Sequence, residues 1–182
     1  MKVFIIHGTF GKPNSNWFPW LKTELEKQGH TVFMPQFPTG IAKQNLTSWT
    51  NKINEYKEHL DDAVFIGHSL SPAFICTLLE NHKAKAAFFV SAFFDIIGID
   101  DYDTCNCTFI THDFDWAKIK KNCPKFFVYY SDNDPYVPQK SLIKSAKLVS
   151  AKPLIINGAG HINAESGYTK FPQLLKDFES IA

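Results

Sequence analysis

The sequence predicts an α/β fold in which helices cover both faces of one parallel sheet. Two observations lead to this prediction: short runs that are apolar at every residue, and intervening stretches whose apolar residues recur at the helical period. Strands buried on both faces read as continuous apolar runs, and alternation of strands with helices is typical of a parallel sheet between helical layers. The length of 182 residues suits a single domain spanning 1–182.

The expected elements follow from these two patterns and from the turn-forming residues at their ends. Strands are predicted over residues 3–6, 31–34, 63–66, 86–90, 126–130 and 154–156. Helices are predicted over residues 17–28, 46–60, 72–80, 116–121, 139–149 and 171–180. The segments 35–45 and 91–115 contain too much polar or turn-forming sequence for a core, so we predict that they are irregular walls of a functional site.

Composition and charge argue against several classes of protein. Apolar residues make up 45% and charged residues 20% of the chain, and the formal net charge is +1. Without a long run of Lys or Arg, nothing indicates nucleic-acid binding. The apolar run near the N-terminus is too short for a signal peptide, and no stretch approaches the length of a membrane span. The 4 cysteines match neither a C-x-x-C redox site nor a zinc framework, which favours reduced thiols in the cytoplasm.

The most informative stretch joins the third predicted strand to the following helix. Residues 67–71 read G-H-S-L-S, between an apolar run and a proline. A serine nucleophile in a tight strand–turn–helix elbow needs small neighbours, and Gly67 meets that need. Ser71 stands where the pattern usually has Gly. The stretch predicts Ser69 as a nucleophile, and a plain turn in which Ser69 caps the helix is the alternative.

Acyl transfer also needs hydrogen-bond donors aimed at the oxyanion that forms on the substrate. The backbone N–H of Leu70, just after the predicted nucleophile, is one candidate. The stretch His7-Gly8-Thr9 follows the first predicted strand, which we expect beside the third, so the Thr9 N–H is the second candidate. A strand-end turn without function is the alternative for His7-Gly8.

Two polar turns later in the chain supply candidates for the remaining roles. Asp132 and Asp134 follow the fifth predicted strand, and an acid that orients a histidine belongs at such a carboxyl end. Pro135 restricts the preceding residue to extended geometry, which favours Asp134, whereas Asp132 suits a capped turn. His161 lies in a glycine-rich stretch after the sixth predicted strand. The chain order Ser, Asp, His is that of the α/β-hydrolases.

Short stretches along nearly the whole chain carry a further signal. They are His7-Gly8, Trp17-Phe18-Pro19-Trp20-Leu21 with Glu24-Leu25, Gly67-His68-Ser69-Leu70, Phe114-Asp115-Trp116 with Ile119-Lys120, Ser131 with Asp134-Pro135-Tyr136-Val137-Pro138, and Gly160-His161-Ile162-Asn163. In these stretches the chain resembles the small serine hydrolases of the YdeN-like and retinoblastoma-binding-protein-9-like group. The resemblance implies a compact α/β-hydrolase core, no large cap, and a triad of Ser69, Asp134 and His161. Ser71 is the one clear departure from the G-x-S-x-G pattern.

These residues predict a serine hydrolase that cleaves a small ester, or an amide, through an acyl-enzyme intermediate. Ser69 attacks the carbonyl carbon, His161 carries the proton, and Asp134 holds the imidazole tautomer. The mechanism requires no metal and no other cofactor. The expected partner is a small-molecule acyl ester, with no nucleic acid and no membrane, and a protein partner is left open.

Three alternatives draw on other features of the sequence. A metal hydrolase would use His7, His68, His112 or Asp113, none of which has a convincing ligand spacing. A nucleotide-binding domain would need a glycine-rich phosphate signature, which is missing. A non-catalytic protein-interaction module on a hydrolase scaffold remains, because a fold does not determine function. Reaction of Ser69 with an active-serine probe separates this module from an enzyme.

The expected strand order predicts where the site lies. In a three-layer α/β/α sandwich with the order 2-1-3-4-5-6, the order reverses between strands one and three, so the site belongs at their carboxyl ends. We expect His7 and Trp17 to contact substrate there, with helix packing as the alternative for Trp17. The segment 91–115 is expected to form a short flap in which Phe93, Phe94 and two neighbouring isoleucines provide an apolar wall for an acyl group.

Overall fold

Six parallel strands form one sheet in the computed structural model, which describes residues 1–181. Their order, β2-β1-β3-β4-β5-β6, is the predicted one. The strands are β1 (Lys2–Ile6), β2 (Thr31–Phe33), β3 (Ala63–His68), β4 (Ala84–Val90), β5 (Phe126–Ser131) and β6 (Leu154–Ile156). Because all neighbouring strands pair in parallel, their carboxyl ends lie at the same edge of the sheet.

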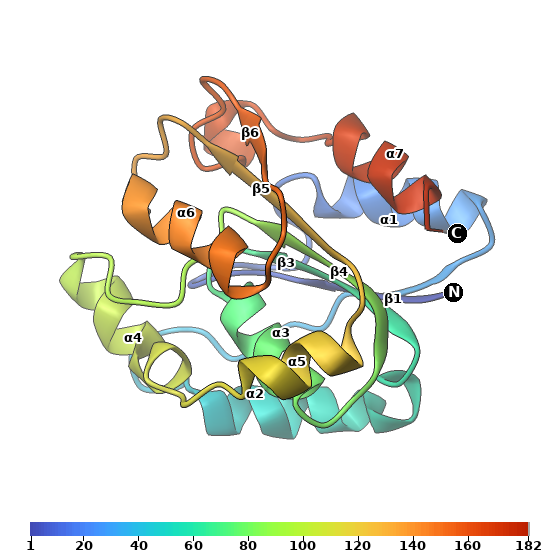
Figure 1. The fold of residues 1–182 in the computed structure, drawn as a ribbon, viewed down its shortest axis with the longest axis horizontal. Coiled ribbons are helices and arrows are strands. Elements are labelled where there is room, and N and C mark those ends of the chain that lie inside the picture. The colour runs from blue at the N-terminus through green and yellow to red at the C-terminus, as the bar shows by residue number, and fades with distance from the viewer. Residues whose placement is uncertain (182) are drawn as a thin grey trace.

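Helices pack on both faces of this sheet, so the predicted three-layer architecture is confirmed (Figure 1). One face is covered by α1 (Phe18–Lys27) and α7 (Pro172–Glu179). The other face is covered by α2 (Leu46–Ile53), α3 (Ser71–Leu79), α4 (Asp100–Ile110), α5 (Trp116–Asn122) and α6 (Gln139–Leu148). Two 3-10 helices, η1 (Asn54–His59) and η2 (Ala164–Ser166), follow α2 and β6. None of the helices within residues 1–181 combines the length and apolar character that a membrane crossing requires.

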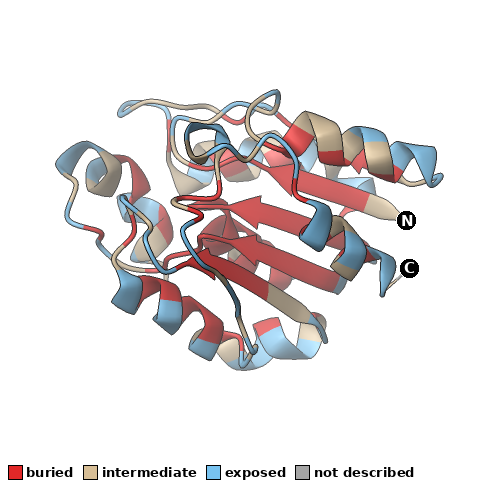
Figure 2. Ribbon diagram, turned by 90° about the horizontal axis from the view of Figure 1, so that it is seen from above, coloured by how far each residue is buried: buried red, intermediate tan, exposed pale blue. Residues whose placement is uncertain are grey.

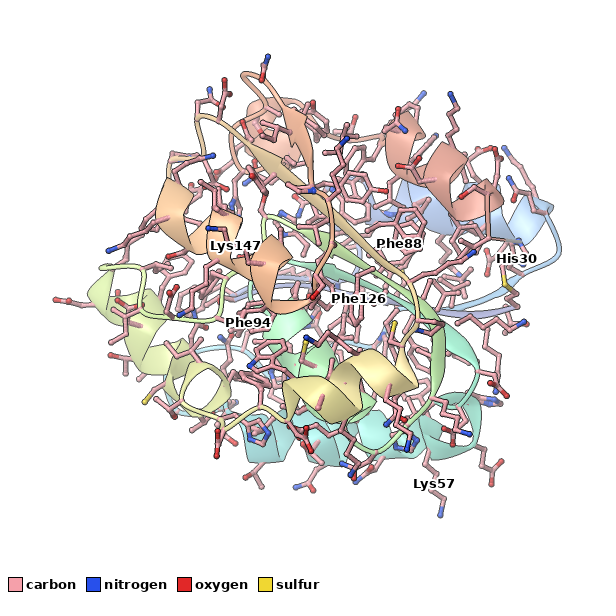
Figure 3. The ribbon with its side chains drawn as sticks, in the orientation of Figure 1. His30, Lys57, Phe88, Phe94, Phe126 and Lys147 are labelled. Atoms are coloured by element: carbon pink, nitrogen blue, oxygen red, sulfur yellow. The ribbon has the colours of Figure 1, made fainter. Side chains whose placement is uncertain are left out.

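Aromatic side chains fill the space between the sheet and its helices. Figure 2 shows the central strands as buried, with exposed residues on the outer faces of helices and in loops. On one face Phe88 stacks on Phe127 with ring centroids 4.4 Å apart. On the other face Trp49 of α2 packs edge-on against Phe74 of α3 at 5.3 Å. In Figure 3 the labelled Phe88 belongs to the first face, and the labelled Phe94 and Phe126 belong to the second. The many phenylalanines are therefore mainly core residues.

Local sequence explains where several helices begin. Proline occupies the first turn of α1, α3 and α7, where its missing N–H costs no helical hydrogen bond. Asn45 caps α2 by accepting the N–H of Ser48 at 2.9 Å. Asp115 caps α5 by accepting the N–H of Lys118 at 2.9 Å. These caps satisfy backbone donors that would otherwise be unpaired at the helix starts.

Three predicted segments differ from the structure. The helix expected over 46–60 ends at Ile53 and continues as η1, in which Tyr56 has a non-helical φ of −116°. The segment 35–45 is irregular, but it places Phe37 in the core at 1% exposure. The segment 91–115 contains α4, which the polar sequence concealed because Asp, Thr, Asn and Cys are weak helix formers. Three acidic residues in the first turn of α4 instead stabilise its positive N-terminal end.

Candidate active site

The candidate nucleophile Ser69 lies in a strained turn between β3 and α3. Its φ of +64° is in the left-handed region that non-glycine residues rarely adopt. Its N–H donates to the carbonyl oxygen of Val90 in the neighbouring strand at 2.8 Å, which fixes the turn to β4. Such a turn after a buried strand is the backbone arrangement of a nucleophile elbow.

The neighbours of Ser69 are packed too tightly for larger residues. A Cβ on Gly67 would lie 2.6 Å from Ile75 Cδ1 and 3.0 Å from Ser71 Oγ. Ser71, the departure from the usual pattern, is completely buried. Its hydroxyl accepts the His68 N–H at 2.7 Å and lies 2.7 Å from the carbonyl oxygen of Ile6, to which it donates. Ser71 is therefore a hydrogen-bonded part of the turn.

The loop after β1 lies directly against the nucleophile. A Cβ built on Gly8 would lie 2.7 Å from Ser69 Cβ, so this close approach requires glycine. The next residue, Thr9, borders the same cavity as Ser69. The backbone N–H groups of Thr9 and Leu70 make no hydrogen bond to any other group in residues 1–181. Unengaged donors on both sides of a nucleophile are what an oxyanion hole requires.

His161 and Asp134 form a buried hydrogen-bonded pair. His161 Nδ1 lies 2.7 Å from Asp134 Oδ2, and the two side chains are 8% and 0% exposed. Burial alone would raise the pKa of Asp134, but hydrogen bonds from His161 and from the N–H groups of Val137 and Tyr136 hold that pKa below its ordinary value. The ionised carboxylate accepts the Nδ1 proton, which leaves Nε2 of the neutral ring as a proton acceptor.

Side chains at the end of β5 fix the loop that carries His161. Ser131 Oγ and Asn133 Oδ1 accept the N–H groups two residues and one residue before this histidine, at 3.0 and 2.8 Å. Asp132, the competing acid, accepts the N–H three residues before it at 2.8 Å. The two aspartates therefore have different partners: Asp132 binds backbone, and Asp134 binds the imidazole.

Three more side chains hold this loop from the interior. His68 Nε2 and Ser91 Oγ lie 2.9 and 3.2 Å from the carbonyl oxygen of His161. Trp17 Nε1 donates to the next carbonyl, that of Ile162, at 3.0 Å. Burial, together with the nearby His161, lowers the pKa of His68 to about 3. The His68 ring is therefore neutral and donates its Nε2 proton to the loop.

A cavity of about 130 Å³ lies beside these groups. Thr9, Ser69 and His161 border it, and so do Tyr136 and Glu165. The Tyr136 hydroxyl donates to Glu165 Oε2 at 2.6 Å. This hydrogen bond raises the pKa of Tyr136 to about 12 and lowers the pKa of Glu165. The cavity thus has a carboxylate at its border as well as the candidate nucleophile and base.

His7, predicted to contact substrate, borders the cavity with both ring nitrogens engaged. Its Nε2 accepts the Phe37 N–H at 3.1 Å, and its Nδ1 donates to the carbonyl oxygen of Gly8 at 2.9 Å. Burial lowers the pKa of His7, and the bond to Gly8 opposes that effect only in part. His112, considered as a metal ligand, pairs with Glu80 at 2.9 Å. Within residues 1–181, no three potential metal ligands are grouped to hold an ion.

The predicted substrate contact of Trp17 and the predicted apolar wall of Phe93 and Phe94 need correction, because these three residues lie in the core and do not border the cavity. Phe94, labelled in Figure 3, packs against the rings of Phe114 and Trp116 at 5.6 and 5.3 Å. Large apolar rings gain more free energy from such burial than from a polar cavity. Of the two isoleucines in the predicted wall, only the second, at position 97, borders the cavity.

Among the residues that border the cavity, Tyr102, Tyr136 and Glu165 were not predicted as site residues from the sequence. Tyr136 follows the predicted acid by two residues and Glu165 follows the predicted base by four, so their positions carried a usable signal. Tyr102 lies on α4, whose existence the sequence pattern did not indicate. Its ring stacks near that of Tyr136 at 6.2 Å.

Comparison with known proteins gives a consistent result. A family described as serine hydrolase matches residues 3–180. Serine hydrolase RBBP9 of Rattus norvegicus is 26% identical over 184 residues, covering 99% of this chain and 95% of that protein. The crystal structure of the ydeN gene product from B. subtilis superimposes with a TM-score of 0.88 at 25% identity, covering 99% and 97% of the two chains. A structure of the lipolytic enzymes LipS and LipT, with a TM-score of 0.71 at 14% identity over 98% and 91% of the chains, shows a likeness of fold alone. The predicted resemblance and the capless α/β-hydrolase fold are confirmed.

Proposed function

This chain belongs to the serine hydrolase family, and from that premise we propose that it cleaves small carboxylic esters through Ser69, His161 and Asp134. The observation that carries the proposal is the 2.7 Å contact between His161 Nδ1 and Asp134 Oδ2 beside a cavity that Ser69 also borders. A carboxylate in this position holds the ring proton on Nδ1 and orients the imidazole, so that Nε2 can serve as the general base.

In the proposed mechanism Ser69 Oγ attacks the carbonyl carbon while His161 Nε2 takes the hydroxyl proton. The negative charge that develops on the carbonyl oxygen is stabilised by the N–H groups of Thr9 and Leu70. His161 then gives its proton to the departing alcohol, which leaves an acyl-enzyme. Water, activated by the same imidazole, releases the acid and restores Ser69.

In the free protein, the contact between Ser69 and His161 that the mechanism requires is not yet formed. Ser69 Oγ makes no hydrogen bond within residues 1–181, so its contact with His161 has to form or shorten when substrate binds. Catalytic hydrogen bonds are often longer in a free enzyme than in its substrate complex. Because several hydrogen bonds anchor the loop that carries His161, we expect the movement that forms this contact to be small.

The cavity supports a choice of substrate class. Its volume of about 130 Å³ suits a short acyl group, and Ile97 and Val137 are its aliphatic lining residues. Lys and Arg are absent from the lining residues, whereas the Glu165 carboxylate is present. We propose short, uncharged acyl esters as substrates, since an anionic acyl group would meet a like charge without a compensating cation.

A labelling experiment tests the proposal. Wild type should react at Ser69 with a fluorophosphonate and hydrolyse p-nitrophenyl acetate faster than the octanoate. Ser69→Ala and His161→Ala should lose both properties. His112→Ala is a control because His112 pairs with Glu80 and does not border the cavity. A folded wild type that neither labels nor hydrolyses any short ester would favour a non-catalytic role instead.

We also propose that the protein acts in the cytoplasm. All four cysteines are free thiols, and Cys76, Cys105 and Cys123 are buried. Reduced cysteines of this kind are typical of a compartment that keeps thiols reduced. Fractionation of the source cells, with an antibody against the chain, would test this proposal.

A further inference from the structure

The side chain of Thr9 is part of a buried polar network, so its hydroxyl is not a donor to the oxyanion. Thr9 Oγ1 lies 2.7 Å from Asn106 Oδ1, and Gln44 Nε2 lies 2.9 Å from the same oxygen. Asn106 and Gln44 are 0% and 2% exposed. Gln44 Oε1 in turn accepts the backbone N–H of Phe10 at 3.2 Å. The network therefore touches the oxyanion loop at two successive residues.

The direction of each hydrogen bond in this network follows from its one unambiguous donor. The Phe10 N–H can only donate, so the atom that it meets is the oxygen of Gln44. The amide nitrogen of Gln44 then faces Asn106 and donates to its oxygen. That oxygen has no proton, so the Thr9 hydroxyl must donate to it. The only proton of the hydroxyl is thereby used, and the Thr9 backbone N–H remains as the donor for substrate.

The network has an energetic cost that a purely structural cluster would avoid. Asn106 Nδ2 is buried and has no hydrogen-bond partner within residues 1–181. An unpaired buried amide loses its hydration without compensation, and an apolar residue at this position would avoid that loss. Local rules of stability are most often broken where a residue serves a functional site.

The network also joins two segments that are far apart in the chain. Gln44 comes from the loop before α2, and Asn106 comes from α4, which lies toward the end of the sheet to which β1 runs (Figure 1). Both segments meet behind Thr9. The hydrogen bond from Thr9 to Asn106 anchors the loop 8–11 to the interior. Without this bond, the position of the loop relative to Ser69 would be less well defined.

We propose that Asn106, supported by Gln44, is a positioning residue that sets the Thr9 N–H in the oxyanion hole. This inference rests on the proposed function, because it assigns a role within the same acyl-transfer site. Asn106 does not border the cavity and acts only through Thr9. Its loss should reduce stabilisation of the transition state more than substrate binding, and so lower kcat more than it changes KM.

Isosteric variants of Thr9 separate the hydroxyl from the backbone N–H. Thr9→Val removes the bond to Asn106 and keeps the N–H. Loss of an oxyanion-hole donor lowers kcat by about 10²–10³-fold, so misplacing one should cost at least roughly tenfold. Thr9→Ser keeps the hydroxyl and should therefore have a kcat several-fold higher than that of Thr9→Val. Asn106→Leu should resemble Thr9→Val, and the double variant should have no lower kcat than Asn106→Leu, since both changes remove the same hydrogen bond between Thr9 and Asn106.

A thionoester substrate supplies a readout that general loss of structure would not change. Sulfur accepts hydrogen bonds more weakly than oxygen, so wild type should prefer the oxygen ester over its thionoester twin. That preference should shrink in Thr9→Val and Asn106→Leu and persist in Thr9→Ser, with folding checked by circular dichroism. If wild type is active and folded Thr9→Val has an unchanged kcat, this inference is wrong and the proposed function still stands. The same holds if the losses of kcat in the double variant multiply. Inactive, unlabelled wild type would overturn the proposed function together with it.

Discussion

The hydroxyl of Ser71 lies 2.7 Å from the carbonyl oxygen of Ile6 and joins the start of α3 to the end of β1. The same hydroxyl accepts the N–H of His68 at 2.7 Å. These two bonds hold the elbow of Ser69 against the strand that leads into the oxyanion loop. The residue that departs from the G-x-S-x-G pattern thus links the two halves of the candidate site.

Removing this hydroxyl should destabilise the protein. Ser71→Ala removes a buried hydrogen-bond partner of the Ile6 carbonyl and of the His68 N–H, which should lower the free energy of unfolding by about 1–3 kcal/mol. Ser71→Gly, which restores the usual motif, should lower it at least as much and should reduce kcat rather than raise it. Urea unfolding of both variants measures the effect. Ser141→Ala is the matched control, because Ser141 is buried and its Oγ has no partner within residues 1–181.

Substitution of the two aspartates should separate their roles. Asp134→Asn removes the charge that holds the His161 tautomer, and comparable losses in a triad lower kcat by roughly 10⁴-fold. Asp132→Asn should change kcat by no more than a few-fold, because an amide oxygen still accepts the loop N–H that Asp132 binds at 2.8 Å. Steady-state turnover of one short ester compares them. A larger loss in Asp132→Asn would reverse the assignment.

Gly8→Ala should inactivate the protein by displacing the oxyanion loop. The new Cβ would lie 2.7 Å from Ser69 Cβ and 2.9 Å from the carbonyl oxygen of His68, and neither atom has freedom to move. A shift of about 1 Å at a reacting group can cost roughly 10²-fold in rate. Leu25→Ala, on the buried face of α1, is the control: it should be destabilised by about 2–5 kcal/mol and yet retain kcat when folded. Equal kcat in wild type and Gly8→Ala would contradict the close contact.

Much of the fold and the candidate site could be predicted because the signals are local. The central strands are mainly apolar runs, so their burial on both faces is evident from the sequence, whereas the edge strand β6 is equally apolar but exposes Leu154 and Ile155. Ser69, Asp134 and His161 each follow a predicted strand, and the carboxyl ends of parallel strands meet at one edge. That geometry brings together residues separated by more than 90 positions without any knowledge of their side-chain contacts.

The features that could not be predicted from the sequence depend on contacts between segments that lack a periodic apolar pattern. Nothing near Asn106 in the sequence indicates that its side chain meets Thr9 and Gln44, since α4 lacks a clear apolar stripe. Phe93 and Phe94 were assigned to the cavity because they follow β4 at the correct edge, but their rings turn inward to the core. Position along the chain predicts the edge of the sheet, whereas side-chain direction in an irregular segment depends on tertiary packing.

The buried neutral His68 should make the protein lose stability in mild acid. Its pKa is lowered from 6.5 to about 3 by burial, whereas in the unfolded chain it keeps the ordinary value. Between about pH 6.5 and 3 the unfolded state therefore binds one more proton than the folded state at this residue. The free energy of unfolding must then fall as the pH falls, by about 1.4 kcal/mol per pH unit for one such group. Asp134, whose pKa is also lowered, contributes in the same direction at lower pH.

His68→Gln should remove this contribution while keeping the hydrogen bond. The Gln amide can donate to the His161 carbonyl oxygen, which His68 Nε2 now meets at 2.9 Å, but it binds no proton in this range. Urea unfolding between pH 6.0 and 4.5 should give a slope against pH that is shallower than that of wild type by about 1 kcal/mol per pH unit. His59→Gln is the control, because His59 is exposed and contributes no buried donor. Parallel slopes for wild type and His68→Gln would show that His68 is charged in the folded state, and its role as a neutral donor to the His161 loop would then be wrong.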